Sequence, residues 1–383
     1  GLGDVYKRQD VARANKLICN IDLVTDNSLT TAERAQYKAE AKIFRAMVMF
    51  DMVRLWGDFP VITTVADDIT SENIDEVYPQ YFPKQNTELE AYQQIEKDLL
   101  DAVLYAPDNT PGNKTLFSKS VARTLLAKIY AEKPLRDYTK VIQYCDEVKA
   151  DGFDLVDDFS DLFGMNAAGT DAKMRNTKES ILEAQFTSGA GNWCTWMFGR
   201  DLVNWNNNFT WAKWVTPSRD LISAFKQEGD EVRFKESIVY YDCNWSNYYP
   251  SDNYPFMYKC RSANSSIIKY RYADVLLLKA EALIMQDTPD LEGAADIIDE
   301  VRDRAKLGAL PTSVRSNKNA MLNALLKERR LELAFEGQRW FDLVRLDKVE
   351  EVMNAVYAKD SGRKAQIYTF DKNSYRLPIP QSV

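Results

Sequence analysis

Two blocks of helical sequence, one in each half of the chain, constrain the fold more than any other feature. The first opens with residues 30–60, in which Thr30 and Glu33 have the spacing of a capping box, Gly57 stands at the C-terminal stop and Pro60 follows. Apolar residues beside the main apolar face of this segment widen it, which predicts a long helix that is covered on more than one side. A chain built from such segments is expected to be mainly α.

Further helices are predicted wherever apolar residues recur at helical spacing between Gly, Pro or Asn breaks. In the first block they cover residues 87–107, 118–134 and 137–152, and in the second block residues 270–286, 290–308, 317–337 and 338–356. Consecutive helices with short breaks favour antiparallel pairs. These resemble tetratricopeptide units, although the consensus Trp, Gly, Tyr and Pro positions of that repeat are not met. The pairs are expected over about residues 30–150 and 270–357.

The segment between the blocks, about residues 152–269, has a different composition. It is rich in aromatic residues, Asn and Gly, and it offers two short strand candidates, residues 180–186 and 237–241, and one helix, residues 217–233. Binding residues concentrate on loops that a rigid scaffold carries. We therefore expect the binding site in this insert.

Five of the eight tryptophans lie between Asn192 and Trp214, at spacings that fit neither one helix face nor strand alternation. Aromatic residues are most often core residues, but the intervening residues here are mainly asparagines rather than Val, Leu or Ile. Flat apolar rings beside amide groups match a sugar, whose C–H faces stack on rings and whose hydroxyls need donors and acceptors. The predicted glycan-binding residues are Trp193, Trp196, Trp205, Trp211, Asn206, Trp245, Tyr248 and Tyr249. The alternative platform is the loop that contains Tyr78, Tyr81 and Phe82.

The overall charge and the missing residue types exclude several function classes. With 49 Lys and Arg against 57 Asp and Glu, the net charge of -8 argues against a nucleic-acid ligand. No apolar run approaches the roughly 18 residues of a membrane span. The chain contains no histidine, which excludes His-based catalytic triads and His-ligated zinc, and its five cysteines form no C-x-x-C pair. Neither a metal nor a cofactor is expected.

The most highly charged helical sequence lies near the C-terminus. Glu328, Glu332 and Glu336 are expected on one helix face, at positions i, i+4 and i+8. Charged neighbours on the same stretch are Arg329, Arg330, Arg339, Asp342 and Arg345. Two such carboxylates would suit a retaining glycosidase, but an acid catalyst needs a raised pKa, and flanking arginines lower it. We therefore predict an ion-pair network between packed helices and no catalytic residue.

The first nine residues are predicted to be foreign to the protein. The stretch "DVYKRQ" is what the mosaic-end adapter of transposase-based sequencing libraries would encode. We hypothesise that residues 1–9 are translated adapter and that the natural N-terminus is missing. On this hypothesis the absence of a targeting segment says nothing about localisation.

Five stretches resemble, in order and in style, the SusD/RagB family of outer-membrane nutrient-binding lipoproteins. The most distinctive is residues 325–346, which carry the pattern E-R-R-x-E-x-x-x-E-G-x-R-x-x-D-L-x-R, and the last is "YRLPIP" at residues 375–380. The other three are residues 39–63, 217–233 and 267–284. The resemblance covers nearly the whole chain after residue 10, so residues 10–383 are predicted to form a single SusD-like domain.

The resemblance implies both a fold and a function. The fold is an α-superhelix of four tetratricopeptide-like helix pairs that carries an irregular glycan-binding region. The function is to bind a polysaccharide or oligosaccharide, without cleaving it, at the surface of a Gram-negative bacterium. The family is anchored in the outer membrane by an N-terminal lipid and is seated on a SusC-like TonB-dependent transporter. Because the signal peptide, the lipidated cysteine and an Asn-rich tail would lie outside this sequence, and Cys19 lacks the context of a lipid acceptor, the chain is predicted to be truncated at both ends.

Three alternatives remain open at this stage. Within the family, the ligand could be a peptide or another nutrient rather than a glycan. From a different class, a glycoside hydrolase on a helical scaffold would release reducing sugar from a polysaccharide. The third alternative is a cytosolic helical-repeat scaffold, which an intact gene without an export signal would support.

Overall fold

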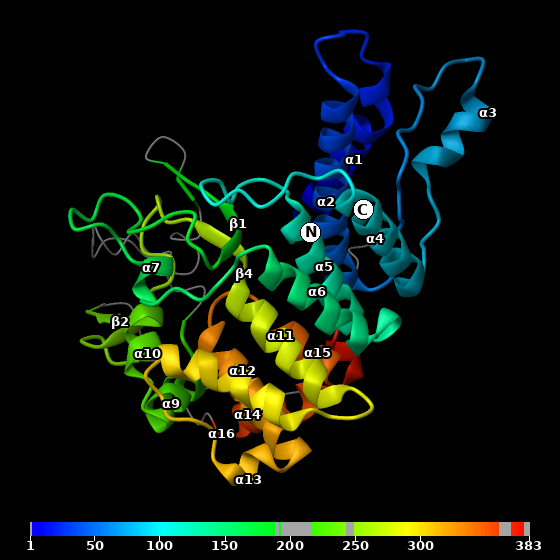
Figure 1. Cartoon of the computed structure of the whole chain (residues 1–383). Coiled ribbons are helices and arrows are strands. Elements are labelled where there is room, and N and C mark those ends of the chain that lie inside the picture. The colour runs from blue at the N-terminus through cyan, green and yellow to red at the C-terminus, as the bar shows by residue number, and fades with distance from the viewer. Residues whose placement is uncertain (1, 188–190, 193–215, 243–248, 360–368, 379–383) are drawn as a thin grey trace. The chain divides into compact units, whose positions relative to one another are not determined.

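The computed structural model describes residues 2–187, 191–192, 216–242, 249–359 and 369–378 (Figure 1). The chain divides into two compact units. Unit 1 comprises Gly1–Asn109, Leu116–Val148 and Lys372–Val383, and unit 2 comprises Thr110–Thr115 and Lys149–Asp371. Helices dominate both units, as the sequence predicts.

Unit 1 is built almost entirely from helices. Its elements are α1 (Leu2–Asn20), η1 (Ile21–Leu23), α2 (Thr31–Trp56), α3 (Ile74–Val77), η2 (Tyr78–Tyr81), α4 (Glu88–Val103), α5 (Lys119–Ala131), η3 (Lys133–Leu135), most of α6 (Tyr138–Ala150) and η5 (Lys372–Ser374). The predicted helices over residues 30–60, 87–107, 118–134 and 137–152 are confirmed. Helix α1 was not predicted, and it begins at Leu2, so it includes most of the residues attributed to an adapter. The origin of those residues stays a hypothesis.

Helix α2 begins and ends at the capping signals predicted from its sequence. Thr30 and Glu33 make the complete capping box, and Gly57 ends the helix with φ +77°, a conformation that favours glycine. The helix packs against both α1 and α4, which explains its wide apolar face. Arg45 in its middle is buried, and it makes a two-pronged ion pair with Asp98 of α4 at 2.7 and 2.6 Å.

In the part of the chain that the structure describes, unit 2 combines helices with four short strands. Its elements are α7 (Ser160–Phe163), β1 (Ser180–Ala184), α9 (Arg219–Glu228), α10 (Glu231–Ser237), β2 (Ile238–Tyr241), β3 (Tyr254–Met257), β4 (Ile267–Arg271), α11 (Tyr272–Met285), α12 (Leu291–Arg304), α13 (Thr312–Arg315), α14 (Lys318–Glu332), α15 (Arg339–Arg345) and α16 (Val349–Lys359). Helices α11, α12 and α14 pack on one another (Figure 1).

The strands form two small antiparallel sheets, β1 with β4 and β2 with β3. The strand candidates at residues 180–186 and 237–241 are confirmed as β1 and β2. Their partners β3 and β4 were missed, since neither shows a clear alternation of apolar and polar residues. All four residues of β3 are buried, and β4 runs without a break into α11.

Three helix predictions need correction. The predicted helix over residues 217–233 is two helices, because Gly229 adopts the left-handed conformation at φ +70° and ends α9. Residues 338–356 likewise divide into α15 and α16, with Asp347 at φ +55° between them. Helix α14 ends at Glu332, and Phe335 and Gly337 have positive φ angles, so Glu336 is not on the face that carries Glu328 and Glu332.

The tetratricopeptide-like pairing, the superhelix and the single-domain organisation remain predictions. No helix within the described residues combines the length and the apolar character that crossing a membrane requires.

Candidate functional site

Seven of the eight residues predicted to bind a glycan lie outside the described residues. They are Trp193, Trp196, Trp205, Trp211, Asn206, Trp245 and Tyr248. The role of these seven residues therefore stays a prediction from the sequence. The eighth, Tyr249, is described and lies beside an open cavity of unit 2.

Tyr249 is only half-buried, but much of its side chain is already engaged. Its hydroxyl donates a hydrogen bond to the carbonyl oxygen of Pro217 at 2.7 Å. Its ring meets that of Tyr254 edge to face at 5.7 Å between centroids, and the Arg219 guanidinium lies 5.2 Å from the ring centre. Tyr249 therefore joins two loop ends and offers a ligand part of its ring, rather than a fully exposed platform.

The cavity beside Tyr249 has a volume of about 450 Å³, which is within the usual range for small-ligand sites. We call it the α9 cavity. Its lining residues are Arg219, Ile222, Ser223, Lys226, Gln227, Tyr240, Tyr249, Pro250 and Asn253. Five of these nine come from α9, at positions i, i+3, i+4, i+7 and i+8, which is one face of a helix.

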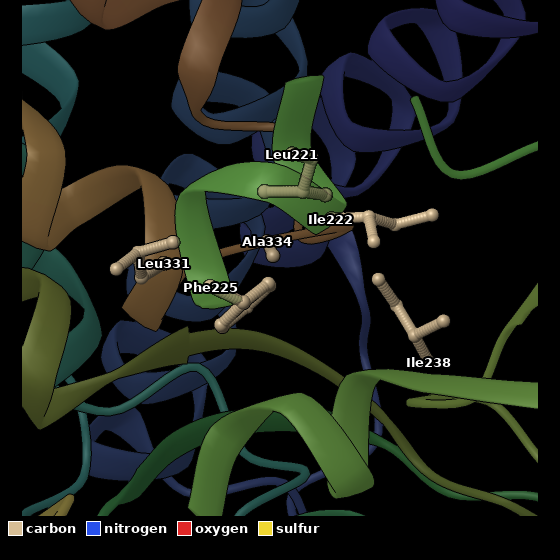
Figure 2. Packing of buried hydrophobic residues seen from close by; sticks show 6 residues of the cluster. All are labelled: Leu221, Ile222, Phe225, Ile238, Leu331 and Ala334. Carbon is tan, nitrogen blue, oxygen red and sulfur yellow. The ribbon is translucent and has the colours of Figure 1, made fainter. Parts of the chain in front are cut away.

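The opposite face of α9 fixes this helix in unit 2. Leu221 and Phe225 are buried, and they pack with Ile238 of β2 and with Leu331 and Ala334 at the C-terminal end of α14. Figure 2 shows these side chains gathered around α9. Burial of a Leu or Phe side chain stabilises the folded protein by roughly 1.5–3 kcal/mol. The apolar face of α9 is therefore held against the core, and the opposite face of the helix is left to line the cavity.

Both ends of α9 are capped by local chemistry. At the N-terminus, the Ser218 hydroxyl accepts a hydrogen bond from the backbone N–H of Leu221 at 3.1 Å. At the C-terminus, Gly229 in the left-handed conformation allows Asp230 to cap α10 directly afterwards. The caps set the length of α9 and so place Arg219 and Lys226 near its two ends.

The lining of the α9 cavity combines three kinds of group. The tyrosine rings of Tyr240 and Tyr249 offer apolar surface, and burial raises the pKa of Tyr240, which keeps its hydroxyl neutral. Amide and hydroxyl groups come from Gln227, Asn253 and Ser223, and the Gln227 amide donates to Ser223 Oγ at 2.9 Å. This is the combination of rings, donors and acceptors that a sugar requires.

Sequence reasoning proposed Tyr249 as a binding residue but did not propose the residues that α9 contributes to the lining of the cavity. The signal was present in the sequence, since Arg219, Ser223, Lys226 and Gln227 form a polar stripe opposite an apolar one. A polar stripe alone indicates only a solvated helix face. The cavity appears because the loop residues around Asn253 lie across from that face, and no periodicity in the sequence predicts this.

A second cavity, of about 310 Å³, lies in unit 1 between α1, α2 and the loop that follows α2. Its lining is mostly apolar, and among the described residues that line it Arg8 is the one charged member. Tyr81 lines it, and the nearby rings of Tyr78 and Phe82 are 4.7 Å apart, with all three side chains about half exposed or more. The alternative platform predicted from the sequence is thus exposed, but the cavity beside it offers few hydrogen-bonding groups.

The carboxylates near the C-terminus form a buried ion-pair network, which confirms the interpretation favoured from the sequence. Glu332 is fully buried, and its carboxylate accepts hydrogen bonds from Arg233 at 3.0 Å and from Arg271 and Arg304. Burial would raise the pKa of Glu332, but the three arginines together hold it well below its usual value. Such a group is a permanent anion and not an acid catalyst.

The other two glutamates of the block are also engaged. Glu328 pairs with Arg233 at 2.5 Å, and Glu336 pairs with Lys259 at 2.6 Å and with Arg271 at 2.7 Å. Burial raises the pKa of a carboxyl group, and it acts on both Glu328 and Glu336. At Glu336 the charges of Arg271 and Lys259 outweigh burial, so the pKa of Glu336 is lowered. At Glu328 burial prevails and raises the pKa, but this side chain is almost completely buried and lines none of the cavities above.

The partners in this network differ from those expected. The arginines around Glu328 and Glu332 come from α10, β4 and α12, rather than from the same stretch of sequence. The flanking arginines pair elsewhere: Arg329 with Asp274 and Asp342, Arg345 with Glu281 and Asp342, and Arg330 with Asp220. Among the described residues, no group of three or more His, Cys, Asp or Glu side chains could hold a metal ion.

Comparison with known proteins agrees with this fold. Residues 249–383 match a family model described as "SusD family", and residues 4–131 match one described as "Starch-binding associating with outer membrane". The chain is 28% identical over 418 residues to SusD-like protein P2 of Formosa agariphila, an alignment that covers 97% of this chain and 75% of the relative.

Solved structures resemble nearly the whole chain. A laminarin-binding SusD-like protein matches with a TM-score of 0.73 at 24% identity, over 98% of this chain and 82% of its own. Surface glycan-binding protein A of Bacteroides thetaiotaomicron, in complex with laminarihexaose, matches with a TM-score of 0.74 at 19% identity, over 98% of this chain and 81% of its own. At these identities the likeness shows the fold alone. The two family models, which match residues 4–131 and 249–383, show that the chain belongs to the SusD/RagB family.

Proposed function

We propose that this chain is a cell-surface glycan-binding protein that captures a polysaccharide or oligosaccharide and hands it to a TonB-dependent transporter of the outer membrane. SusD-like proteins bind glycans and do not cleave them, and this chain is accordingly a binding protein rather than an enzyme. The permanent charge of Glu332 within its arginine cage agrees with this assignment.

The observation that carries the proposal is the composition of the α9 cavity. Tyrosine rings stand beside amide and hydroxyl groups, and the cavity is open to solvent, as binding of a polymer requires. The names of two structural neighbours, one laminarin-binding and one in complex with laminarihexaose, favour a glycan over a peptide. Capture of a peptide or another nutrient remains the second candidate.

The tryptophans predicted from the sequence belong to the same proposal. We expect Trp193, Trp196, Trp205, Trp211 and Trp245 to stack on sugar rings of the glycan, as the sequence predicts. Each ring contact is expected to contribute about 0.5–1.5 kcal/mol, by analogy with aromatic pairs. A few such contacts must offset an association cost of roughly 4–15 kcal/mol. The expected dissociation constants are therefore roughly ten micromolar to a millimolar, tightening with chain length.

The hand-off and the membrane anchor are the finer parts of the proposal. One matching family model describes outer-membrane association, which supports a location at the outer membrane. We infer that an N-terminal lipid provides the anchor and that a SusC-like transporter receives the glycan. Co-purification of the full-length lipoprotein from native membranes in mild detergent should recover a large β-barrel partner. Repeated recovery of the lipoprotein alone would contradict the hand-off.

Binding to a glycan panel tests the central claim. The chain should bind at least one of laminarin, starch and a set of plant, host and microbial polysaccharides, release no reducing sugar, and bind none of a panel of peptides. Replacing the exposed lining residue Asn253 by Ala should weaken binding by about 1 kcal/mol, or roughly fivefold, through the loss of a hydrogen bond. Asn319→Ala, at an exposed position on α14 that lines none of the cavities above, is the matched control and should change nothing. Binding of peptides but of no glycan would overturn the proposal.

A further inference from the structure

A third cavity, of about 250 Å³, lies in unit 1, where α2 packs against α4 and against η1. We call it the α2 cavity. Six of its nine described lining residues come from one face of α2. The volume is slightly below the usual range for small-ligand sites, which suits a single sugar unit. The lining residues are Asp22, Thr31, Arg34, Ala35, Lys38, Ala39, Lys42, Asp101 and Tyr105.

Two Lys–Asp ion pairs stand next to each other in this cavity. Lys38 pairs with Asp22 of η1, and Lys42 pairs with Asp101 of α4 at 3.1 Å. The two lysines are four residues apart on α2, which is about 6 Å along the helix axis. Each ion pair uses one N–H of an ammonium group and one lone pair of a carboxylate, so further donors and acceptors remain for a ligand. Both carboxylates are about half exposed or more, and a ligand can therefore reach them.

Arg34 fixes the end of the cavity that holds Asp22. Its guanidinium donates hydrogen bonds to three backbone carbonyls between residues 21 and 29, at 2.6, 3.1 and 3.1 Å. These bonds hold the turn between η1 and α2 against the first turns of α2, and so place Asp22 beside Lys38. A site that is formed in advance binds with a smaller loss of conformational freedom.

An aromatic ring and two small side chains complete the lining. Tyr105 lies just after the end of α4 and is 59% exposed, so its ring is accessible. Ala35 and Ala39 face the same cavity and leave room for a ligand to approach the ion pairs. Ring, donors and acceptors are the groups that a sugar requires. Because both lysines are already paired with carboxylates, the site favours a neutral, hydroxyl-rich ligand over an anion.

We propose that the α2 cavity is a second glycan-binding site, which takes one sugar unit between Tyr105 and the two Lys–Asp pairs. This inference rests on the proposed glycan-binding function and adds a site in unit 1 to the α9 cavity of unit 2. The C–H face of the sugar stacks on Tyr105. Its hydroxyls donate to the carboxylates of Asp22 and Asp101 and accept from the two ammonium groups.

The experiment counts the oligosaccharides that bind to one chain. Hexasaccharides of the glycans in the binding panel, laminarihexaose and maltohexaose among them, are titrated into the whole chain. Native mass spectrometry counts the bound molecules, and isothermal titration calorimetry gives the affinities. At least one hexasaccharide should show two binding events on the wild type. Tyr105→Ala should weaken one of them about two- to tenfold, as expected for the loss of one ring contact.

Further variants assign this binding event to the α2 cavity. Tyr105→Phe should keep the affinity because the ring remains, and Lys42→Met should weaken the same event severalfold because it removes the ammonium donors. The matched controls are Leu104→Ala, beside Tyr105, and Lys16→Met on α1, since both residues are exposed and line none of the cavities above. Asn253→Ala should weaken the other event alone. Melting temperatures of all variants establish that unit 1 and unit 2 remain folded.

The outcomes separate the two proposals. A single binding event that Asn253→Ala weakens and Tyr105→Ala does not would overturn the second site and leave the glycan-binding function standing. A single event that only Tyr105→Ala weakens would place the glycan in the α2 cavity and refute the α9 cavity instead. Two events that Tyr105→Ala affects no more than Leu104→Ala would refute the assignment to the α2 cavity. Binding of no glycan in the panel would overturn the function and the inference together.

Discussion

Replacement of Glu332 by Gln tests whether the buried charges hold unit 2 together. In the wild type one carboxylate oxygen of Glu332 accepts from Arg271 and Arg304, and the other accepts from Arg233 at 3.0 Å. Gln has nearly the same shape, but it has one acceptor oxygen and turns an NH₂ group toward guanidinium donors. The substitution therefore removes a buried anion and sets donor against donor without creating a cavity.

The magnitude follows from this geometry. Breaking a buried ion pair by removing one partner costs about 3–5 kcal/mol, because the remaining charge is left buried and uncompensated. Each of the three arginines keeps another carboxylate: Arg233 keeps Glu328, Arg271 keeps Glu336 and Arg304 keeps Glu179. The loss should therefore lower stability without unfolding the unit. For a unit of this size each kcal/mol corresponds to roughly 2–4 °C, so the melting temperature should fall by about 6–20 °C.

The assay is thermal and urea unfolding of the variant beside Glu292→Gln. Glu292 pairs with Arg315, but its side chain is 69% exposed, so its loss should cost no more than about 1 kcal/mol. Glycan affinity of the folded Glu332→Gln protein should stay within about twofold of the wild type, since Glu332 does not line the α9 cavity. Equal destabilisation by the two substitutions would refute the argument for the network. A large loss of affinity in the folded protein would instead place a ligand site on α14.

Three further predictions concern other parts of the molecule. The pKa of Glu332 in the folded protein lies well below its ordinary value of 4.5, so its contribution to stability is present above about pH 4.5 and is lost as the pH falls through the folded pKa. In urea titrations, the difference in unfolding free energy between wild type and Glu332→Gln should therefore shrink below about pH 4.5. A difference that stays constant with pH would contradict this prediction. Asp98→Asn should destabilise unit 1 by about 3–5 kcal/mol in urea unfolding, because it removes the buried carboxylate paired with Arg45, and a loss below about 1 kcal/mol would argue against that pair. Gly229→Ala should cost about 1–2 kcal/mol through its positive φ alone, because an added Cβ would meet no atom within 4 Å; an unchanged melting temperature would mean that the turn relaxes at little cost.

Helices were predictable where the sequence contains its own start and stop signals. Thr30 with Glu33 and Gly57 bound α2 as expected. A second capping box, Thr87 with Glu90, starts α4 at the beginning of its predicted range. Local signals of this kind act within one turn, so a single sequence reveals them. The same reasoning failed at Gly229, which ends α9 with a positive φ, and at Glu332, where α14 ends inside a continuous helical pattern.

Non-local partners were not predictable in the same way. Pairing of Glu332 was foreseen, but the partners Arg233 and Arg304 are 99 and 28 residues away in sequence. The sequence shows that a charged residue needs a partner, and only the fold decides which one it meets. The α9 cavity is a similar case. In the sequence, its polar helix face has the pattern of an ordinary solvated surface, and only the fold brings the loop of Asn253 to the other side of the cavity.

The apolar and the ionic contacts around α9 have complementary roles in unit 2. Leu331 of α14 packs against the apolar face of α9, while Glu328 and Glu332 of the same helix pair with Arg233 of α10, four residues after Gly229 at the end of α9. One helix therefore fixes both α9 and the element that follows it. Apolar packing tolerates small sliding motions, whereas a guanidinium between carboxylates has a defined position and direction. The buried charges are best understood as setting the orientation of α9, and with it the direction in which Arg219 and Lys226 face the cavity.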